Sequence, residues 1–230
     1  MPDLVSASGP YTHAAVMGDI VSSQKADPTA LYDVFNHAIL GANHDAGTTL
    51  ASPLTITLGD EFQGLCHTLQ GGLALIRQLR ARLRAAKVPC RFVLGVVRIE
   101  TPMNTENAWN MMGPGLADTR AKLSNKRDPN AYRFHLPEAP TMEILLQAVG
   151  ATLTEIEEGW TERQAEVVAE TLDTTLTEPQ LAEKFNVTRR AIYKVRSAAR
   201  LDLYKDQWLA AEAGVTHLDK AYGLRCPPIS

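Results

Sequence analysis

Apolar residues in the first 140 positions follow two spacings, one typical of strands and one typical of helices. Unbroken or alternating apolar runs predict strands at about 14–17, 54–66 and 91–98, with a closing edge strand at 132–135. Apolar residues three or four positions apart predict helices at about 28–42, 69–84 and 116–123. This order of elements predicts an α+β sandwich of the ferredoxin-like kind, a mainly antiparallel sheet covered by helices on one face.

The stretch from Thr55 to Gly64 is predicted to be two short strands folded back on each other. Gly59 and Asp60 suit a two-residue turn, because both residue types tolerate the positive φ of tight hairpins. In the predicted sandwich, Asp19 at the end of the first strand lies beside this turn. Mg²⁺ and Mn²⁺ are usually held by one or two carboxylates, with phosphate and water as the other ligands. The expected proximity of Asp19 and Asp60 therefore predicts a site for a metal ion bound to phosphate. A purely structural Gly-Asp turn is the alternative.

Other residues near these two strand ends complete the predicted metal–phosphate site. Gly18 and Gly59 would keep the approach open, and backbone amides after Asp19 would donate to phosphate oxygens. Serines that follow the first strand could also contact phosphate, although a turn uses serine equally well. The predicted nucleotide-binding residues are Gly18, Ile20, Ser22, Ser23 and Gly59.

The character of the chain changes after about residue 139, where strand signals vanish. A connecting helix is predicted at 142–158, followed by helices at about 162–173, 178–185, 188–199 and 201–213. The sequences Thr161–Gln164 and Thr177–Gln180 both fit the capping box of a helix start. We therefore expect a disordered leader (1–12), an α+β domain (13–139), a connecting helix (140–160), a helix-turn-helix domain (161–213) and a loosely packed tail (214–230).

Residues Gln180 to Val195 follow the helix-turn-helix pattern. Ala182 is the small residue where two helices cross, and Asn186 occupies the turn, where left-handed φ favours Gly or Asn. Val187, Ile192 and Val195 are predicted to form the buried side of the second helix. The predicted DNA-binding residues are Thr188, Arg189, Arg190, Tyr193, Lys194, Arg196 and Arg200. A helical hairpin used for protein contacts or dimerisation is the alternative.

The distribution of charge along the chain also favours DNA binding by the helix-turn-helix region. The net charge is −3, and residues 1–150 balance 13 acidic against 13 basic side chains. Residues 151–183 carry nine acidic side chains against Arg163, whereas residues 184–205 carry seven basic side chains against Asp202. A basic patch is thus confined to the last third. The arginines of the helix at 69–84 are interpreted as a solvated face, with an acidic ligand as the alternative.

Cysteine use and hydropathy predict a cytoplasmic protein. Cys66, Cys90 and Cys226 lack the spacing of a metal or redox site, and the first two are expected in the core. The first residues do not resemble a signal peptide, and no apolar stretch approaches the ~20 residues that span a bilayer. We expect no membrane partner.

The segments GDIVSS (18–23) and ITLGDEFQG (56–64) resemble the SatD family of bacterial proteins, as do RFVLGVVRIET (91–101) and Met112-Gly-Pro-Gly with Arg120. More distantly, the arrangement resembles class III nucleotidyl cyclases and diguanylate cyclases, in which two aspartates bind metal ions that engage a nucleoside triphosphate. The resemblance implies Asp19 and Asp60 as metal ligands, Glu61 as a further acidic residue, and Arg120 as a catalytic candidate. The asparagine that cyclases place four residues before this arginine is absent, because Leu116 stands there.

Three functions follow as hypotheses. The first is a dimeric DNA-binding regulator whose cyclase-like domain binds a metal-bound nucleotide, with Mg²⁺ or Mn²⁺ and double-stranded DNA as partners. The second is a metal-dependent nucleotidyl cyclase or nucleotidyltransferase that acts on a nucleoside triphosphate. The third is a non-catalytic scaffold in which the acidic hairpin is structural.

Overall fold

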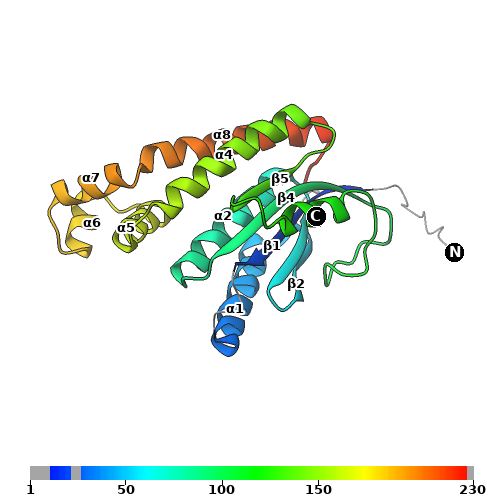
Figure 1. Ribbon diagram of the computed structural model, residues 1–230, viewed down its shortest axis with the longest axis horizontal. Coiled ribbons are helices and arrows are strands. Elements are labelled where there is room, and N and C mark those ends of the chain that lie inside the picture. Colours follow the sequence, from blue (N-terminus) through cyan, green and yellow to red (C-terminus); the bar gives the residue numbers. More distant parts are fainter. Residues whose placement is uncertain (1–10, 22–26, 227–230) are drawn as a thin grey trace.

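The computed structural model describes residues 11–21 and 27–226, and its first half is a five-stranded mixed sheet with the strand order β2-β3-β1-β4-β5 (Figure 1). Every neighbouring pair is antiparallel except β4 and β5, which are parallel. The predicted order of strands and helices is confirmed. The strands are β1 (Tyr11–Ile20), β2 (Leu50–Leu58), β3 (Glu61–Cys66), β4 (Cys90–Ile99) and β5 (Tyr132–His135).

Helices cover both faces of this sheet. One face, which includes Val16 and Phe92, packs against α1 (Pro28–Ala46), α2 (Leu69–Ala85) and two later helices. The opposite face, which includes Met17 and Val93, packs against α3 (Leu116–Ser124). The prediction of helices on one face only was therefore wrong. The nearly unbroken apolar run of β4 already indicated a strand buried on both sides.

The predicted hairpin between β2 and β3 is confirmed. Gly59 and Asp60 form its turn, and Gly59 alone of the two adopts a positive φ of 52°. The short 3-10 helix η2 (Gly47–Thr49) leads from α1 into the hairpin. Cys66 and Cys90 are buried free thiols, as predicted, and burial raises the pKa of each to about 12. Neither thiol is poised for reaction at neutral pH.

Helices α4 (Pro140–Glu158) and α8 (Leu201–Tyr222) lie side by side along the sheet domain (Figure 1). Leu153 of α4 and Trp208 of α8 belong to the same core as the sheet. The predicted connecting helix is present as α4, and it also packs into the core. The prediction of a loosely packed tail from residue 214 was wrong. Helix α8 continues for nine residues beyond 213, because its apolar spacing persists through Val215 and Leu218.

The C-terminal half of α8 is also fixed by its polar contacts. Asp219 accepts hydrogen bonds from the amides of Leu69 (2.6 Å) and Gln70 (3.0 Å), so it caps the first turn of α2.

At the other end of the chain, Tyr11 and Thr12 belong to β1, and the rest of the predicted leader lies outside the described residues. No helix in the described part of the chain combines the length and apolar character needed to cross a membrane.

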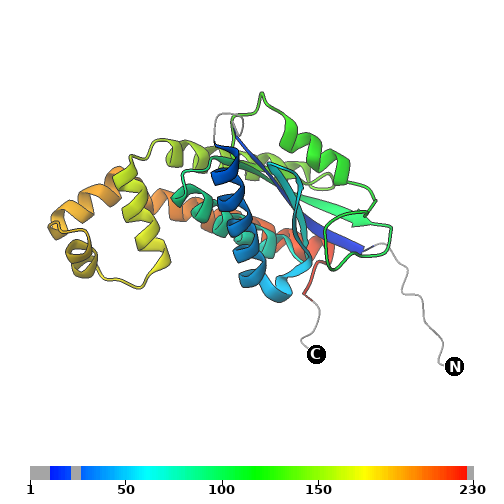
Figure 2. The same ribbon diagram turned by 90° about the horizontal axis from the view of Figure 1, so that it is seen from below.

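Helices α5 (Glu162–Asp173), α6 (Glu178–Lys184) and α7 (Arg189–Ala198) form a small body at one end of the molecule (Figures 1 and 2). Both predicted capping boxes contribute. Gln164 Oε1 accepts from the Thr161 amide at 2.8 Å, and Gln180 Oε1 accepts from the Thr177 amide at 2.9 Å. The core of this body contains Val167, Leu181, Ala182 and Ile192.

The buried carboxylate of Glu157 in α4 joins the sheet region to α8. It accepts hydrogen bonds from Arg80 Nε of α2 (2.7 Å), Tyr132 Oη of β5 (2.5 Å) and Tyr204 Oη of α8 (2.9 Å). Arg84 donates to the Glu157 carbonyl at 2.5 Å. We call these five residues the Glu157 network. The interpretation of the α2 arginines as a solvated face was wrong for Arg80, which is only 9% exposed, whereas Arg77 and Arg82 remain partly exposed.

An indole ring connects this network to the end of α7. Trp160 lies against the ring of Tyr204, with 4.9 Å between centroids, and its Nε1 donates to the carbonyl of Ala199 at 2.7 Å. The Arg84 guanidinium lies 4.9 Å from the centroid of the Trp160 ring. The helical end of the molecule is thus attached to the sheet region through named side-chain contacts.

Candidate functional site

The end of β1 and the starts of β3 and β4 bring three charged residues together. The register pairs Asp19 of β1 with Glu61 of β3 on one side and with Arg91 of β4 on the other. Residues paired across antiparallel strands share a face of the sheet, so their side chains are near neighbours. We call Asp19, Glu61 and Arg91 the strand-end triad.

The sequence predicted a pair of Asp19 and Asp60, whereas the register puts Glu61 directly opposite Asp19. Asp60 lies in the hairpin turn beside the end of β1, and its carbonyl accepts a hydrogen bond from the Ile20 amide at 3.0 Å. The structure thus brings Asp60 close to Asp19 through its backbone. The side chain that shares a cross-strand position with Asp19 is that of Glu61.

The Asp19 carboxylate is already engaged within the protein. It forms an ion pair with the Arg91 guanidinium, and the two side chains are only 16% and 15% exposed. Sequence reasoning did not single out Arg91, although its place at the start of a buried strand was a usable signal. A cation at Asp19 would have to share that carboxylate with Arg91.

The strand-end triad offers a small set of ligands for Mg²⁺ or Mn²⁺. Within residues 11–21 and 27–226, no cluster of three or more His, Cys, Asp or Glu side chains has the arrangement of a metal site. Asp19 and Glu61 nevertheless supply two hard oxygen ligands, the number that Mg²⁺ usually takes from protein when phosphate and water complete its shell. The triad fits such an ion only together with a phosphate ligand.

The residues predicted to bind nucleotide have different environments. A Cβ at Gly18 would overlap the Phe62 ring, so this glycine serves core packing and does not open the site. Ile20 is buried and its amide is bonded to Asp60, so that amide is not free for phosphate. Gly59 is exposed at the turn, where a Cβ would meet no atom within 4 Å. Ser22 and Ser23 lie outside the described residues.

Arg120 of α3 lies on the same face of the sheet as the triad. Its Nη2 donates to Gln63 Oε1 at 2.6 Å, and Gln63 is cross-strand from Met17, one step along the strands from Asp19. Gln63 Nε2 in turn donates to the carbonyl of Ala108 in the loop after β4. Gln63 therefore holds Arg120 and this loop above the sheet, a role that the sequence did not indicate.

The turn of the predicted helix-turn-helix has the expected geometry. Asn186 has a φ of 50°, and Thr188 caps α7 by accepting a hydrogen bond from the Ala191 amide at 3.2 Å. Ile192 is fully buried and Val195 partly buried, as predicted. Val187 was predicted to be buried but is 39% exposed, because it lies in the turn ahead of the helix and not on its inner face.

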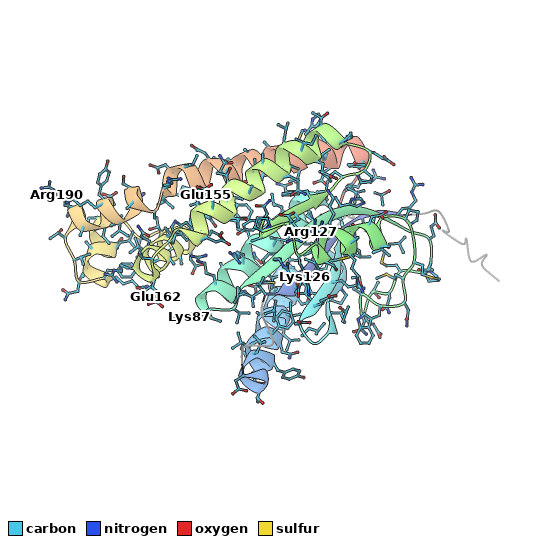
Figure 3. The ribbon with its side chains drawn as sticks, viewed as in Figure 1. Lys87, Lys126, Arg127, Glu155, Glu162 and Arg190 are labelled. Carbon is cyan, nitrogen blue, oxygen red and sulfur yellow. The ribbon has the colours of Figure 1, made fainter. Side chains whose placement is uncertain are left out.

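The cationic side chains of α7 divide into free and engaged ones. Arg189, Arg190 and Lys194 are exposed, and Tyr193 is 65% exposed beside them. Arg190 lies at the end of the molecule far from the sheet (Figure 3). Arg196 forms an ion pair with Glu178 at 2.9 Å, and Arg200 starts α8 with a φ of 54°. The outward row of α7 therefore consists of Arg189, Arg190, Tyr193 and Lys194.

Comparison with known proteins identifies the family. The chain matches the SatD family over residues 13–213, which is most of its length. It belongs to the SatD family. No curated protein matches its sequence. Among solved structures, a bacterial light-regulated adenylyl cyclase is similar over 58% of this chain and 46% of its own, with 11% sequence identity and a TM-score of 0.41. This similarity spans less than half of that cyclase and assigns no activity to this SatD-family chain.

Proposed function

We propose that this SatD-family protein is a DNA-binding regulator. Helix α7 would read duplex DNA, and the sheet region, as a ferredoxin-like domain of the cyclase type, would bind a metal–nucleotide ligand. The observation that carries the proposal is the outward row of α7, which is cationic and exposed while Ile192 closes the opposite face. Basic side chains at this position of a helix-turn-helix meet base edges and phosphates in the major groove. Such proteins commonly read two half-sites, so we expect a homodimer on DNA.

The ligand half of the proposal rests on the face that holds the strand-end triad. Glu61 and Asp19 would hold Mg²⁺ or Mn²⁺, which would neutralise charge on the phosphates. Arg91 carries guanidinium donors that suit a phosphate oxygen, so binding would exchange its contact with Asp19 for one with the ligand. Arg120 and Gln63 line the same face further along β1 and β3.

The DNA half is tested by selecting bound duplexes from a random pool and measuring affinity by fluorescence anisotropy at several salt concentrations. Arg190→Ala and Lys194→Ala should each weaken binding to the selected duplex. The matched control is Lys220→Ala, which removes an exposed cation at the far end of α8 and should leave affinity unchanged. Equal affinity of wild type and both α7 variants would refute DNA reading by this helix.

The ligand half is tested by thermal melting with nucleoside triphosphates and Mg²⁺. A ligand that binds only the folded chain raises the melting temperature by mass action. Glu61→Gln should abolish the rise, whereas Glu106→Gln, an exposed acid in the loop after β4, should keep it. Equal rises in wild type and Glu61→Gln would leave the hairpin with a structural role alone.

A second candidate, a metal-dependent nucleotidyl cyclase or nucleotidyltransferase, is favoured by one observation. Arg120 lies on the same sheet face as Asp19 and Glu61, where an arginine can stabilise charge that develops on a transferred phosphate. Incubation with each nucleoside triphosphate and Mn²⁺, followed by mass analysis, distinguishes the two candidates. A product that disappears in Arg120→Ala supports the enzyme, and the absence of any product leaves the binding role.

A further inference from the structure

A cavity of about 530 Å³ lies where the sheet region meets the helical end of the molecule. Its walls come from the end of α2, the start of β4, the loop before β5 and the last residue of α4. Five cationic side chains line it: Arg80, Arg84, Lys87, Arg91 and Lys126. Only two acidic side chains, Asp128 and Glu158, belong to the same lining. We call it the junction cavity.

The cations of the junction cavity differ in how far their donors are used. Arg80 is satisfied, since Nε donates to Glu157 at 2.7 Å and Nη1 to the Cys90 carbonyl at 3.0 Å. By contrast, the Nε atoms of Arg84 and Arg91 are buried and have no hydrogen-bond acceptor among the described residues. A buried donor without an acceptor is costly and uncommon in folded proteins. Both side chains line the junction cavity, so a rotation of either guanidinium group would bring an unused donor to an acceptor held inside it.

The two lysines of the cavity, Lys87 and Lys126, can move toward a ligand without breaking a strong contact. Lys126 is exposed and, within the described part of the chain, forms no ion pair. Lys87 pairs with Glu162 of α5 at 2.7 Å, but both side chains are about four-fifths exposed, so this pair is weak. Figure 3 shows Lys87 and Glu162 facing each other between the sheet region and the helical end.

The size and apolar part of the lining narrow the ligand class. The volume falls within the range of pockets that hold drug-sized or cofactor-sized molecules. Val88, Pro89 and Pro129 provide apolar surface beside the cations, which suits a molecule with an uncharged ring and an anionic group. Arginine donates in a fork that matches phosphate oxygens.

We propose that the junction cavity binds a phosphorylated small molecule of nucleotide size, without a metal ion, through Arg84, Arg91 and Lys126. The junction cavity shares Arg91 with the strand-end triad, but Asp19 and Glu61 do not line it. A phosphate there also competes with Trp160 for Arg84 and with Glu162 for Lys87, which are contacts to the helical end. Binding would therefore weaken two contacts that hold the helical end, which carries α7, against the sheet region.

The test is calorimetry of the full-length protein with inorganic pyrophosphate and with ATP, in EDTA and at constant ionic strength. Wild type should bind at least one of the two probes. Lys126→Glu should weaken binding by about tenfold or more, a loss equivalent to ~1.4 kcal/mol. The matched control is Arg127→Glu, which makes the same charge change at the next residue (both are labelled in Figure 3). Arg127 does not belong to the cavity lining. Both residues are exposed, so both variants should fold.

Each result decides the proposal. Binding that survives in Arg127→Glu and in Glu61→Gln but falls in Lys126→Glu supports the junction cavity. No binding of either probe by wild type overturns it, as does an equal loss in Lys126→Glu and Arg127→Glu, which would mean general charge attraction. Binding that falls in Glu61→Gln and survives in Lys126→Glu also overturns it, while it leaves the proposed metal–nucleotide site standing.

Discussion

Helices α2 and α7 each carry four cationic side chains, but the structure uses the two sets in opposite ways. On α2, Arg80 is buried against Glu157, Arg84 lies over Trp160 and Arg77 pairs with Glu212 at 3.1 Å. On α7, Arg189, Arg190 and Lys194 face solvent. A cationic helix can therefore be held by internal contacts in one place and face solvent in another.

The difference comes from what lies opposite each helix. Helix α2 packs between the sheet and α8, where a buried carboxylate and aromatic rings accept its guanidinium groups. Helix α7 packs only its apolar side against α5 and α6, and the one acid that it contacts through an ion pair among the described residues is Glu178. Cations left without internal partners remain available to an external polyanion.

Replacement of Glu157 should give the largest effect on stability. Glu157→Ala leaves Arg80 buried without its counter-ion and removes the acceptor of two tyrosines, so we expect a loss of about 3–5 kcal/mol of unfolding free energy. Urea unfolding measures it. Glu158→Ala removes the exposed neighbouring acid and should change stability by no more than about 0.5 kcal/mol. Similar small losses of unfolding free energy in both variants would mean that the contact of Arg80 with Glu157 does not stabilise the fold.

The next largest effect is expected in DNA binding. Arg190→Ala should cost about 1–3 kcal/mol of binding free energy if this residue contacts a base, and should leave the stability of the fold nearly unchanged. Arg77→Ala removes the same charge from α2 and should leave DNA affinity unchanged. Anisotropy titrations with the selected duplex measure both. A comparable loss of affinity in Arg77→Ala would erase the distinction between the two helices.

A smaller effect is expected in the alkaline range from the two tyrosines that donate to Glu157, the carboxylate that also holds Arg80 of α2. Burial and the Glu157 carboxylate raise the pKa of Tyr132 well above its usual value, and burial with Glu157 also raises the pKa of Tyr204. The unfolded chain then loses these protons before the folded one does, so the contribution of the two tyrosines to stability is full below about pH 10 and falls as pH rises. Tyr204→Phe should flatten the dependence of unfolding free energy on pH above 10. An unchanged slope would contradict this assignment.

The smallest effect is expected for Arg82, an α2 arginine whose acidic partner is exposed. Arg82 pairs with Asp45, and the two side chains are 35% and 44% exposed. Exposed pairs contribute about 0–1 kcal/mol, so Arg82→Ala should have little influence on urea unfolding. A loss as large as that of Glu157→Ala would show that exposure does not separate the two kinds of arginine.

The sequence by itself determined the local features of this protein. The order of elements, the Gly59–Asp60 turn, the two capping boxes and the left-handed Asn186 each depend on residues within a few positions of one another. Propensity, turn chemistry and periodicity act over that range, so the pattern is sufficient. The membership of Cys66 and Cys90 in the core was predictable for the same reason.

Only the tertiary structure decided which side chains meet. The register of β1 against β3 and β4 placed Glu61 and Arg91 beside Asp19, and a shift of one residue would have put other side chains there. The return of α8 onto α2 and α4 decided that Arg80 is buried against Glu157, 77 positions away. The partner of a charged side chain depends on packing between elements that are distant in the chain. Local sequence patterns do not specify which distant elements come into contact.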